Sequence, residues 1–212
     1  MRVEIWSDVV CPWCYLGKRR FEKALHGFEE HEKIEVVWRS FQLDPSYPRG
    51  RRQPHSEYLA TKLGRSPEQV RSMNDHLTAL AAAEGLAYDF DSYIAVNTFA
   101  AHRLTQLARA HGLGAHMHER LLRAQLVEGQ VLDDADTLAR LSEDVGLPAA
   151  GAHRVLAGDA YTADVHEDIR QARNLGIHGV PFFVIDRRYG ISGAQQTDVF
   201  RQALQTAWDQ AA

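Results

Sequence analysis

The 212-residue sequence predicts a mixed α/β fold in which a sheet-containing unit is interrupted by an inserted all-α segment. Three observations support this. Runs of β-type residues lie only near the two ends of the chain, and a long stretch between them has an almost purely helical pattern. The two cysteines, the only ones in the sequence, stand where the first β-type run gives way to a helical run. At this length the chain buries a sufficient core, either as one domain with an insertion or as two small domains.

The N-terminal part predicts a strand, a helix and a second strand. Residues 3–7 alternate in polarity, as a half-buried strand does. From Tyr15 onward, hydrophobic residues recur at helical spacing, which predicts a helix that ends near His31. Residues 34–41 are rich in β-branched and aromatic side chains and predict the second strand. This order is a βαβ unit.

The middle of the chain predicts helices that differ in length and composition, so it is not a repeat array. Residues 44–54 contain three prolines and predict an irregular connection. Ser66, Pro67 and Gln69 suit the N-cap, first and third positions of a helix that ends near Gly85. Further helices are predicted at residues 94–111, 115–128, 135–145, 148–156 and 163–175.

The C-terminal part predicts two strands and a helix. Residues 179–185 form a strongly apolar run, a polar turn follows, and a short strand is predicted at residues 189–192. A final amphipathic helix is predicted at residues 197–209. With the βαβ unit, this ββα unit predicts a thioredoxin-like fold. We expect residues 1–48 and 176–212 to form the thioredoxin-like domain and residues 49–175 to form the inserted helical domain.

Composition and charge exclude several classes of partner. The net charge of -4 gives no general attraction to nucleic acid or to acidic membranes. No apolar run has the length of a membrane span. A cleaved signal peptide would remove the first cysteine. We therefore expect a cytoplasmic protein that binds neither nucleic acid nor membrane, in a reducing compartment that favours catalytic over structural cysteines.

The two cysteines form a C-P-W-C motif at residues 11–14, which predicts reversible thiol chemistry. Cys11 is expected at a helix N-terminus, where the helix dipole favours a thiolate. Cys14 lies one turn along the same face and can close a disulfide with it. These two are the candidate catalytic residues. Pro12 and Trp13 between them are candidate substrate contacts, although Trp13 could equally pack against the inserted helices.

Three other interpretations of the motif are weaker. A zinc site needs two more ligands, and His111, His116 and His118 have no paired spacing to the cysteines, so we predict no metal. A structural disulfide across so short a loop would constrain the unfolded chain very little. Two inert core cysteines would rarely flank a strand-to-helix boundary with a proline between them.

Pro181 is the second candidate for the site, because it precedes the apolar strand near the far end of the chain. An arbitrary X-Pro bond is usually trans, and a proline can simply start a strand. In a thioredoxin-like fold with a C-x-x-C motif, this proline is instead expected to be cis and to face the thiols. The backbone of Val180 would then be free to pair with a substrate segment.

Several stretches from both ends of the chain carry a family resemblance. They are Ser7-Asp8, Cys11-Pro12-Trp13-Cys14-Tyr15-Leu16-Gly17, Trp38-Arg39-Ser40-Phe41-Gln42-Leu43, Gly179-Val180-Pro181-Phe182-Phe183 and Ser192-Gly193-Ala194-Gln195. With these stretches the sequence resembles the DsbA family of thiol-disulfide oxidoreductases, and within it the FrnE-like branch. The resemblance covers nearly the whole chain.

This resemblance implies a thioredoxin fold with an inserted helical domain, a nucleophilic Cys11, a resolving Cys14 and a cis Pro181. It implies an oxidoreductase or disulfide isomerase that acts through a mixed disulfide on protein or small-molecule thiols and disulfides. No cofactor beyond the redox-active disulfide is implied, and glutathione as a co-substrate is left open. Trp13 stands where the strongly oxidising members have histidine, so a strongly oxidising potential is not implied.

A neighbouring branch suggests an alternative function. Asn97-Thr98 and His102-Arg103 resemble a stretch of the kappa-class glutathione transferases and 2-hydroxychromene-2-carboxylate isomerases. Those enzymes activate glutathione for small aromatic substrates and use a serine where this chain has Cys11. The two cysteines therefore favour the oxidoreductase. A non-catalytic peptide-binding module on the same scaffold is a third hypothesis.

Polar residues near these motifs carry weaker expectations. We expect Asp8 to cap the first helix, with modulation of Cys11 as the less favoured role. We expect Asn97 and His102 to face solvent on an amphipathic helix, and the eleven histidines to be scattered over the surface. Gln195 is expected mainly at a turn that leads into the last helix, and substrate contact is its less favoured role.

Overall fold

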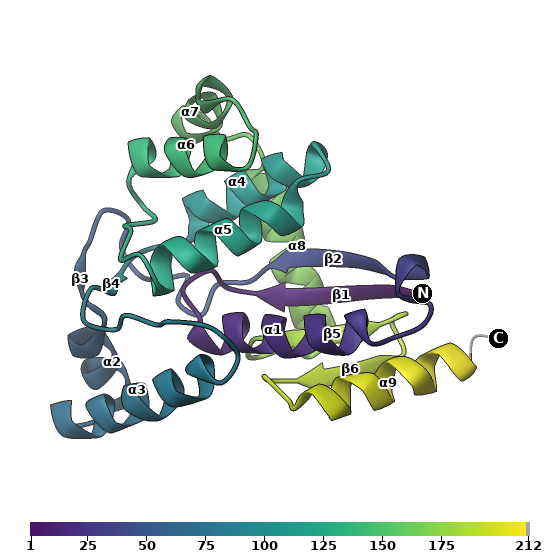
Figure 1. The fold of residues 1–212 in the computed structure, drawn as a ribbon. Coiled ribbons are helices and arrows are strands. Elements are labelled where there is room, and N and C mark those ends of the chain that lie inside the picture. The colour runs from purple at the N-terminus through teal and green to yellow at the C-terminus, as the bar shows by residue number, and fades with distance from the viewer. Residues whose placement is uncertain (211–212) are drawn as a thin grey trace.

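A computed structural model describes residues 1–210, and its centre is a four-stranded mixed sheet in the order β2-β1-β5-β6 (Figure 1). The strands are β1 (Arg2–Ser7), β2 (Glu35–Ser40), β5 (Phe182–Ile185) and β6 (Tyr189–Ser192). β1 runs parallel to β2 and antiparallel to β5, and β6 is antiparallel to β5. The predicted βαβ and ββα units are confirmed, and β1 joins them in one sheet.

The first helix differs from its predicted extent. α1 spans Pro12–His26 instead of running to His31. At Gly27 the chain tightens, because the N–H of Phe28 bonds to the carbonyl oxygen of Leu25 only three residues back. Residues His31–Lys33 form a separate 3₁₀ turn before β2.

Between the two halves of the sheet the chain is mostly helical, as predicted. The helices are α2 (His55–Leu63), α3 (Pro67–Ala82), α4 (Phe99–Ala110), α5 (Gly114–Leu126), α6 (Ala135–Asp144), α7 (Ala149–Ala157) and α8 (Thr162–Asn174), and α9 (Thr197–Asp209) follows β6. The predicted capping box at Ser66 and Gln69 begins α3. None of the helices within residues 1–210 has the length and apolar character needed to cross a membrane. The division into two domains stays a prediction.

Two features of this segment differ from the prediction. No separate helix is predicted where α2 lies, and the helix predicted at residues 94–111 begins only at Phe99. Ile94–Ala95 instead forms β4, which pairs with β3 (Gln53–Pro54). The start of α4 is fixed by Asn97, whose side-chain oxygen accepts the N–H of Phe99 at 2.9 Å.

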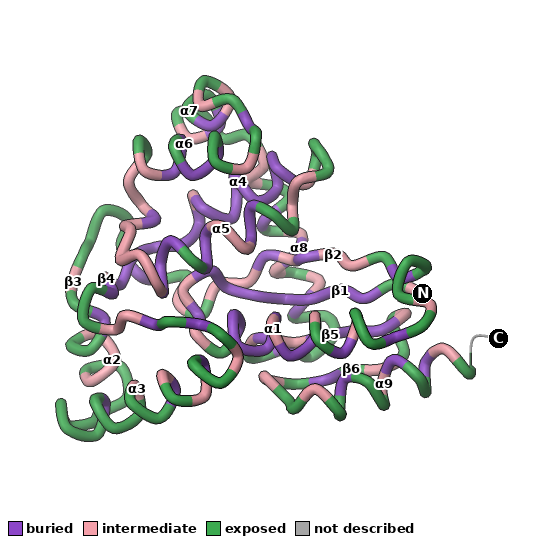
Figure 2. Tube along the Cα trace, in the orientation of Figure 1, coloured by how far each residue is buried: buried purple, intermediate pink, exposed green. Residues whose placement is uncertain are grey.

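The sheet is covered on both faces. Val3 and Ile5 of β1 join aromatic side chains of α1, β5 and α9. Phe183 of β5 and Phe200 of α9 pack with ring centroids 4.6 Å apart. Alternate residues of a strand point to opposite faces, so Trp6 contacts the α8 side instead. Figure 2 shows β1 as one of the most continuously buried parts of the chain.

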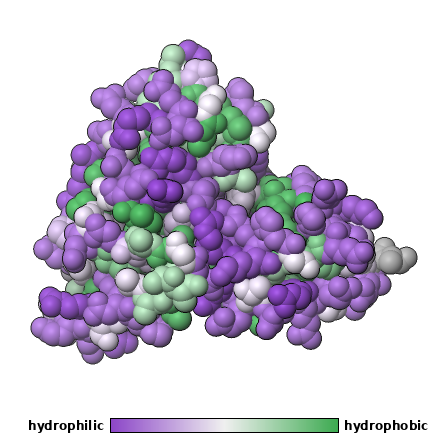
Figure 3. Space-filling view, in the orientation of Figure 1, coloured by the Kyte–Doolittle hydropathy of each residue, from purple (hydrophilic) through white to green (hydrophobic). Residues whose placement is uncertain are grey.

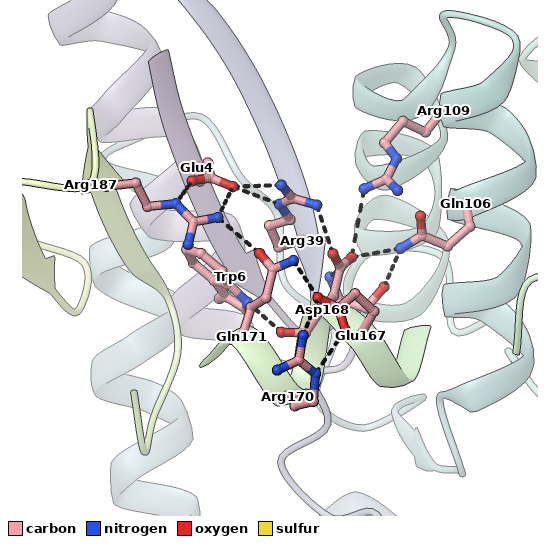
Figure 4. A network of polar contacts seen from close by, with 11 residues as sticks. Glu4, Trp6, Arg39, Gln106, Arg109, Glu167, Asp168, Arg170, Gln171 and Arg187 are labelled. Carbon is pink, nitrogen blue, oxygen red and sulfur yellow. Dashed lines mark hydrogen bonds and ion pairs between the residues drawn. The ribbon is translucent and has the colours of Figure 1, made fainter. Parts of the chain in front are cut away.

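A buried polar network connects the sheet to α4 and α8 (Figure 4). The Asp168 carboxylate accepts hydrogen bonds from Arg39 at 2.9 Å, from the Ser40 N–H at 3.0 Å and from Gln106 at 2.6 Å. Arg39 also donates to Glu4 of β1 at 2.6 Å. Burial opposes ionisation of Glu4, but the cationic side chains around it outweigh this and hold the pKa of its carboxyl below the usual value.

The pair α2 and α3 lies beside the end of β1 where α1 begins (Figure 1). Both helices are mostly exposed, and α2 has a single buried residue, His55 (Figure 2). An amphipathic helix usually buries its apolar stripe against protein. The apolar side of α2 faces a cavity that is lined in part by Tyr58, Leu59 and Leu63.

Candidate active site

The C-P-W-C motif lies where β1 ends and α1 begins. Cys11 is the N-cap residue of α1, and Pro12 occupies the first helical position. The N–H of Cys11 bonds to the Asp8 carbonyl oxygen at 3.0 Å, and the N–H of Cys14 bonds to the Cys11 carbonyl oxygen at 2.9 Å. No acidic residue lies in the first turn of α1, so the positive end of the helix dipole is available to a thiolate at Cys11.

The two thiols have different surroundings. Cys11 is 4% exposed, while Cys14 is completely buried. Only Cys11 lines the cavity that opens beside the motif. Burial, together with the neighbouring Cys11 sulfur, raises the pKa of the Cys14 thiol well above its usual value. The geometry therefore gives Cys11 access to a substrate and keeps Cys14 protonated behind it.

The structure brings Val180 and Pro181 next to Cys11 from the far end of the chain. The Val180–Pro181 peptide bond is cis. The Cys11 thiol donates to the Val180 carbonyl oxygen, with sulfur and oxygen 3.7 Å apart. Gly17 permits this approach, because a Cβ at that position would lie 2.9 Å from the Pro181 ring.

Trp13 and Pro12 also lie at this site. Both line the cavity, and Trp13 is 42% exposed. The Pro12 carbonyl oxygen accepts a hydrogen bond from the hydroxyl of Tyr88 at 2.6 Å, and the Tyr93 hydroxyl donates to the Val10 carbonyl oxygen. Sequence reasoning missed these two tyrosines, because nothing in their local pattern shows that they bond to a loop about 80 residues away.

The expectation that Asp8 caps α1 is wrong. Asp8 is 1% exposed, its side chain accepts the N–H of Leu43 at 2.8 Å, and it lies 3.1 Å from Nε2 of His102. His102 is also 1% exposed, which contradicts the expectation that it faces solvent. The carboxylate turns inward because the end of β1 lies between α4 and the chain after β2, which together provide two polar partners.

Other polar residues also differ from expectation. Asn97 is buried, and its amide donates to the Tyr47 carbonyl oxygen at 2.6 Å. His118 is buried as well, where it stacks on Trp38 with centroids 4.1 Å apart and contacts the Ser7 hydroxyl at 2.8 Å. Asn97 precedes α4 and lies against the chain after β2, and α5 packs against the sheet on the side that carries His118, so the prediction of solvent-facing side chains fails.

Gln195 agrees with its expectation, whereas the histidines agree only in part, because His55, His102 and His118 are buried. Gln195 is exposed and donates to the Ser192 carbonyl oxygen at 2.8 Å, in the turn before α9. His111 and His116 are exposed. Within residues 1–210, no group of three or more His, Cys, Asp or Glu side chains is arranged to hold a metal ion.

The cavity beside Cys11 has a volume of about 430 Å³. Its walls come from the end of β1, the chain after β2, helices α2 and α3, and β4. His55 contributes to the wall and stacks on Tyr93, with ring centroids 3.9 Å apart. Burial lowers the pKa of His55 to about 4, so its ring is neutral at pH 7.

His55 makes folding stability depend on pH. The unfolded chain binds a proton at His55 near pH 6.5, whereas the folded protein binds it only near pH 4. The stabilisation is therefore complete above pH 6.5 and is lost as the pH falls toward 4. In urea unfolding at pH 7 and pH 5, we expect the wild type to lose about 2 kcal/mol more stability than His55→Phe. Equal losses in the two proteins would contradict this assignment.

Comparisons with known proteins agree with this geometry. The family model of the DsbA-like thioredoxin domain matches residues 2–205. The crystal structure of a probable DsbA oxidoreductase from Streptomyces coelicolor is 46% identical, with a TM-score of 0.96 over 99% of this chain and 90% of that one. Protein YwbO of Bacillus subtilis is 27% identical over 96% of each chain.

Two further structures share the fold at low identity. The cytosolic disulfide reductase DsbM from Pseudomonas aeruginosa is 21% identical, with a TM-score of 0.67 over 99% of each chain. A 2-hydroxychromene-2-carboxylate isomerase is 16% identical, with a TM-score of 0.75 over 100% of this chain and 98% of that one. The family match extends across both halves of the sheet, the C-P-W-C motif and Pro181, and the chain belongs to the DsbA-like thioredoxin domain family.

Proposed function

We propose that the protein is a cytoplasmic thiol-disulfide oxidoreductase or disulfide isomerase whose reactive group is the Cys11–Cys14 pair. One observation carries the proposal: Cys11 reaches a cavity, while Cys14 lies one helical turn behind it with no exposed surface. A substrate can therefore meet only the first thiol directly. The second thiol is held for an intramolecular step.

The reaction runs in two exchanges. The Cys11 thiolate attacks one sulfur of a substrate disulfide, forms a mixed disulfide and releases the other sulfur as a thiolate. Cys14 then loses its proton and attacks the Cys11 sulfur, which closes the Cys11–Cys14 disulfide and releases the second substrate thiol. The substrate gains two electrons and the protein loses two. In the reverse direction, the oxidised protein introduces a disulfide into a dithiol.

Residues around the thiols have distinct roles in this scheme. Val180 contacts Cys11, so the substrate atoms joined to that sulfur lie beside the Val180 backbone. Pro181, whose ring lies against Gly17 of α1, holds Val180 at this position. Pro12 and Trp13 line the cavity and contact the substrate there. Asp8 and His102 are buried behind the motif, and the contact between their side chains holds the loop that ends in Cys11.

Reduction or isomerisation is the direction that a reducing cytoplasm favours. The Pseudomonas aeruginosa protein of the same fold is a cytosolic disulfide reductase, and one of its structures contains glutathione. This likeness supports glutathione as the thiol that returns the protein to its reduced form. Two molecules of glutathione supply the two electrons and leave as glutathione disulfide.

The proposal predicts that Cys14→Ser traps the mixed disulfide. Without the resolving thiol, Cys11 still attacks, but the adduct cannot be released within the protein. Incubation of the reduced variant with bis(2-hydroxyethyl) disulfide should give a stable adduct on intact mass, which thiols remove. The wild type should instead show an internal disulfide, and the Cys11→Ser/Cys14→Ser double variant should show neither. Labelling of a Cys11→Ser single variant as fast as that of Cys14→Ser would contradict the assignment of Cys11.

The apolar cavity that reaches Cys11 favours one alternative function. A glutathione-dependent transferase or isomerase acting on a small aromatic molecule would use the same cavity, and the isomerase with this fold is consistent with that hypothesis. It predicts stoichiometric noncovalent glutathione on the native protein and activity that survives in Cys14→Ser. Accumulation of a Cys11 mixed disulfide in that variant, when no thiol is added, would favour the oxidoreductase.

A further inference from the structure

The cavity beside Cys11 gathers most of the large hydrophobic side chains that the described chain exposes. Six such side chains are at least 40% exposed within residues 1–210. Four of them line this cavity, namely Trp13, Leu43, Leu63 and Met73. Exposed hydrophobic residues scattered singly need no explanation, but their concentration at one concave site marks a binding surface. On the face seen in Figure 3, hydrophobic side chains also surface between α3 and α5, within a mainly hydrophilic exterior.

Helix α2 forms one wall. Tyr58, Leu59 and Leu63 line the cavity, and their spacing places them on one side of the helix. Leu63 is 46% exposed, and α2 buries only its first residue. This apolar side therefore lacks the protein partner that normally covers the apolar stripe of an amphipathic helix.

The walls suit an apolar ligand without a net charge. Asp44 accepts hydrogen bonds from the Tyr58 hydroxyl at 2.7 Å and from the Lys62 ammonium at 3.1 Å. Asp8 is engaged by Leu43 and His102 behind the wall. The carboxylates and the ammonium that line the cavity thus have partners already. A glutathione molecule, with two carboxylates and one ammonium, would lose hydration if its whole body lay in the cavity, and would gain no free counter-charge; as the reducing thiol it has only to bring its sulfur to Cys11.

The size and the ring content of the cavity narrow the ligand class. A volume of about 430 Å³ lies within the usual range for small-molecule pockets, about 300–1,000 Å³, and exceeds the volume of any single amino-acid side chain. Its wall contains the rings of Trp13, His55, Tyr58 and Tyr93. Ring faces and edges in this arrangement bind flat apolar bodies well. A protruding side chain of a polypeptide would leave part of the space unfilled.

We propose that the substrate of the Cys11–Cys14 pair is a low-molecular-mass disulfide with a neutral aromatic body, which lies in this cavity with one sulfur against Cys11. This inference rests on the oxidoreductase function proposed above. Cys11 attacks the near sulfur, and the far half leaves as a thiolate and takes a proton. Cys14 then releases the near half as a second thiol. A low-molecular-mass thiol, two molecules per cycle, reduces the protein again and becomes a disulfide.

The test compares two disulfides on the full-length reduced protein. The aromatic probe is 4,4′-dithiodipyridine and the small polar probe is bis(2-hydroxyethyl) disulfide, and the second-order rate constant for oxidation of the Cys11–Cys14 pair is measured for each. Leu63→Asp places a charge on the cavity wall. Leu175→Asp is the matched control, because Leu175 is 40% exposed at the end of α8 and does not line the cavity.

We expect Leu63→Asp to lower the rate constant for oxidation by the aromatic disulfide about tenfold, because the substitution removes one leucine contact. The rate constant for the polar disulfide should not change. Leu175→Asp should change neither. If Leu63→Asp does not fold, Met73→Asp on α3 with Val199→Asp on α9 repeats the comparison, since these residues are 44% and 43% exposed.

Each outcome has a defined consequence. Failure of both disulfides to oxidise wild-type Cys11 would contradict the proposed function itself. Oxidation by both, with equal rates in Leu63→Asp and Leu175→Asp, would overturn the cavity assignment and leave the function intact. An equal loss for both disulfides in Leu63→Asp alone would also overturn it. The disulfides of insulin serve as a polypeptide substrate. If Leu63→Asp slows their reduction as much as it slows the reaction with the aromatic probe, the cavity binds polypeptide side chains instead.

Discussion

Replacement of Cys11 by serine is expected to lower disulfide exchange at least about a thousandfold. A serine hydroxyl is not ionised near pH 7 and cannot form a disulfide, so both exchanges of the proposed cycle stop. Cys11 is the sulfur that lines the cavity, and Cys14 has no exposed surface with which to replace it. The measurement is the steady-state rate of reduction of bis(2-hydroxyethyl) disulfide by glutathione.

The Cys14→Ser variant is the matched control for this experiment. It makes the same chemical change three residues away, yet it should retain the first exchange and form a mixed disulfide, which glutathione in the assay then removes. The unfolding midpoint in urea should be similar for both variants, because each replaces one sulfur by one oxygen. A Cys11→Ser variant that kept full exchange activity would remove Cys11 from the mechanism.

Replacement of Asp168 by alanine is expected to destabilise the folded protein by about 3–5 kcal/mol. The carboxylate is 1% exposed and accepts from Arg39, the Ser40 N–H and Gln106, all within 3.0 Å. Loss of the Asp168 carboxylate removes the shared acceptor of these three buried donors. Arg39 then keeps only Glu4 as a charged partner. Urea unfolding at pH 7 measures the difference in free energy of unfolding.

Glu167, the neighbour of Asp168 in α8, provides the comparison. Its carboxylate pairs with Arg170 on the surface at 2.7 Å, and both side chains are well exposed. Glu167→Ala should therefore cost less than about 1 kcal/mol. Similar losses for the two variants would show that the buried contacts of Asp168 contribute no more than the exposed Glu167–Arg170 ion pair at the edge of the same network (Figure 4).

Local patterns predicted the parts of the fold that depend on near neighbours. The last helix, Thr197–Asp209, and the strand Tyr189–Ser192 have the predicted bounds, because each shows clear periodicity between strong turn signals. The capping sequence at Ser66 fixed the start of α3 for the same reason. The placement of the C-P-W-C motif at a strand-to-helix boundary follows from the same kind of signal.

The residues that sequence reasoning misjudged are those whose environment comes from distant segments. Asp8, His102 and His118 look like surface residues on local grounds, yet each is buried against a partner about 90 or more residues away. α2 was missed because prolines and arginines precede it and its apolar side faces a cavity. The pattern of such a helix differs little from that of an irregular segment.

Redox equilibration tests the central claim most directly. The purified protein is equilibrated across a series of ratios of reduced to oxidised glutathione, and intact mass reports the state of Cys11 and Cys14. The account predicts a reversible loss of two protons without an adduct, with a midpoint between about -120 and -270 mV. A protein that never forms the internal disulfide, and instead holds one noncovalent glutathione per chain, would contradict the account and favour the transferase or isomerase.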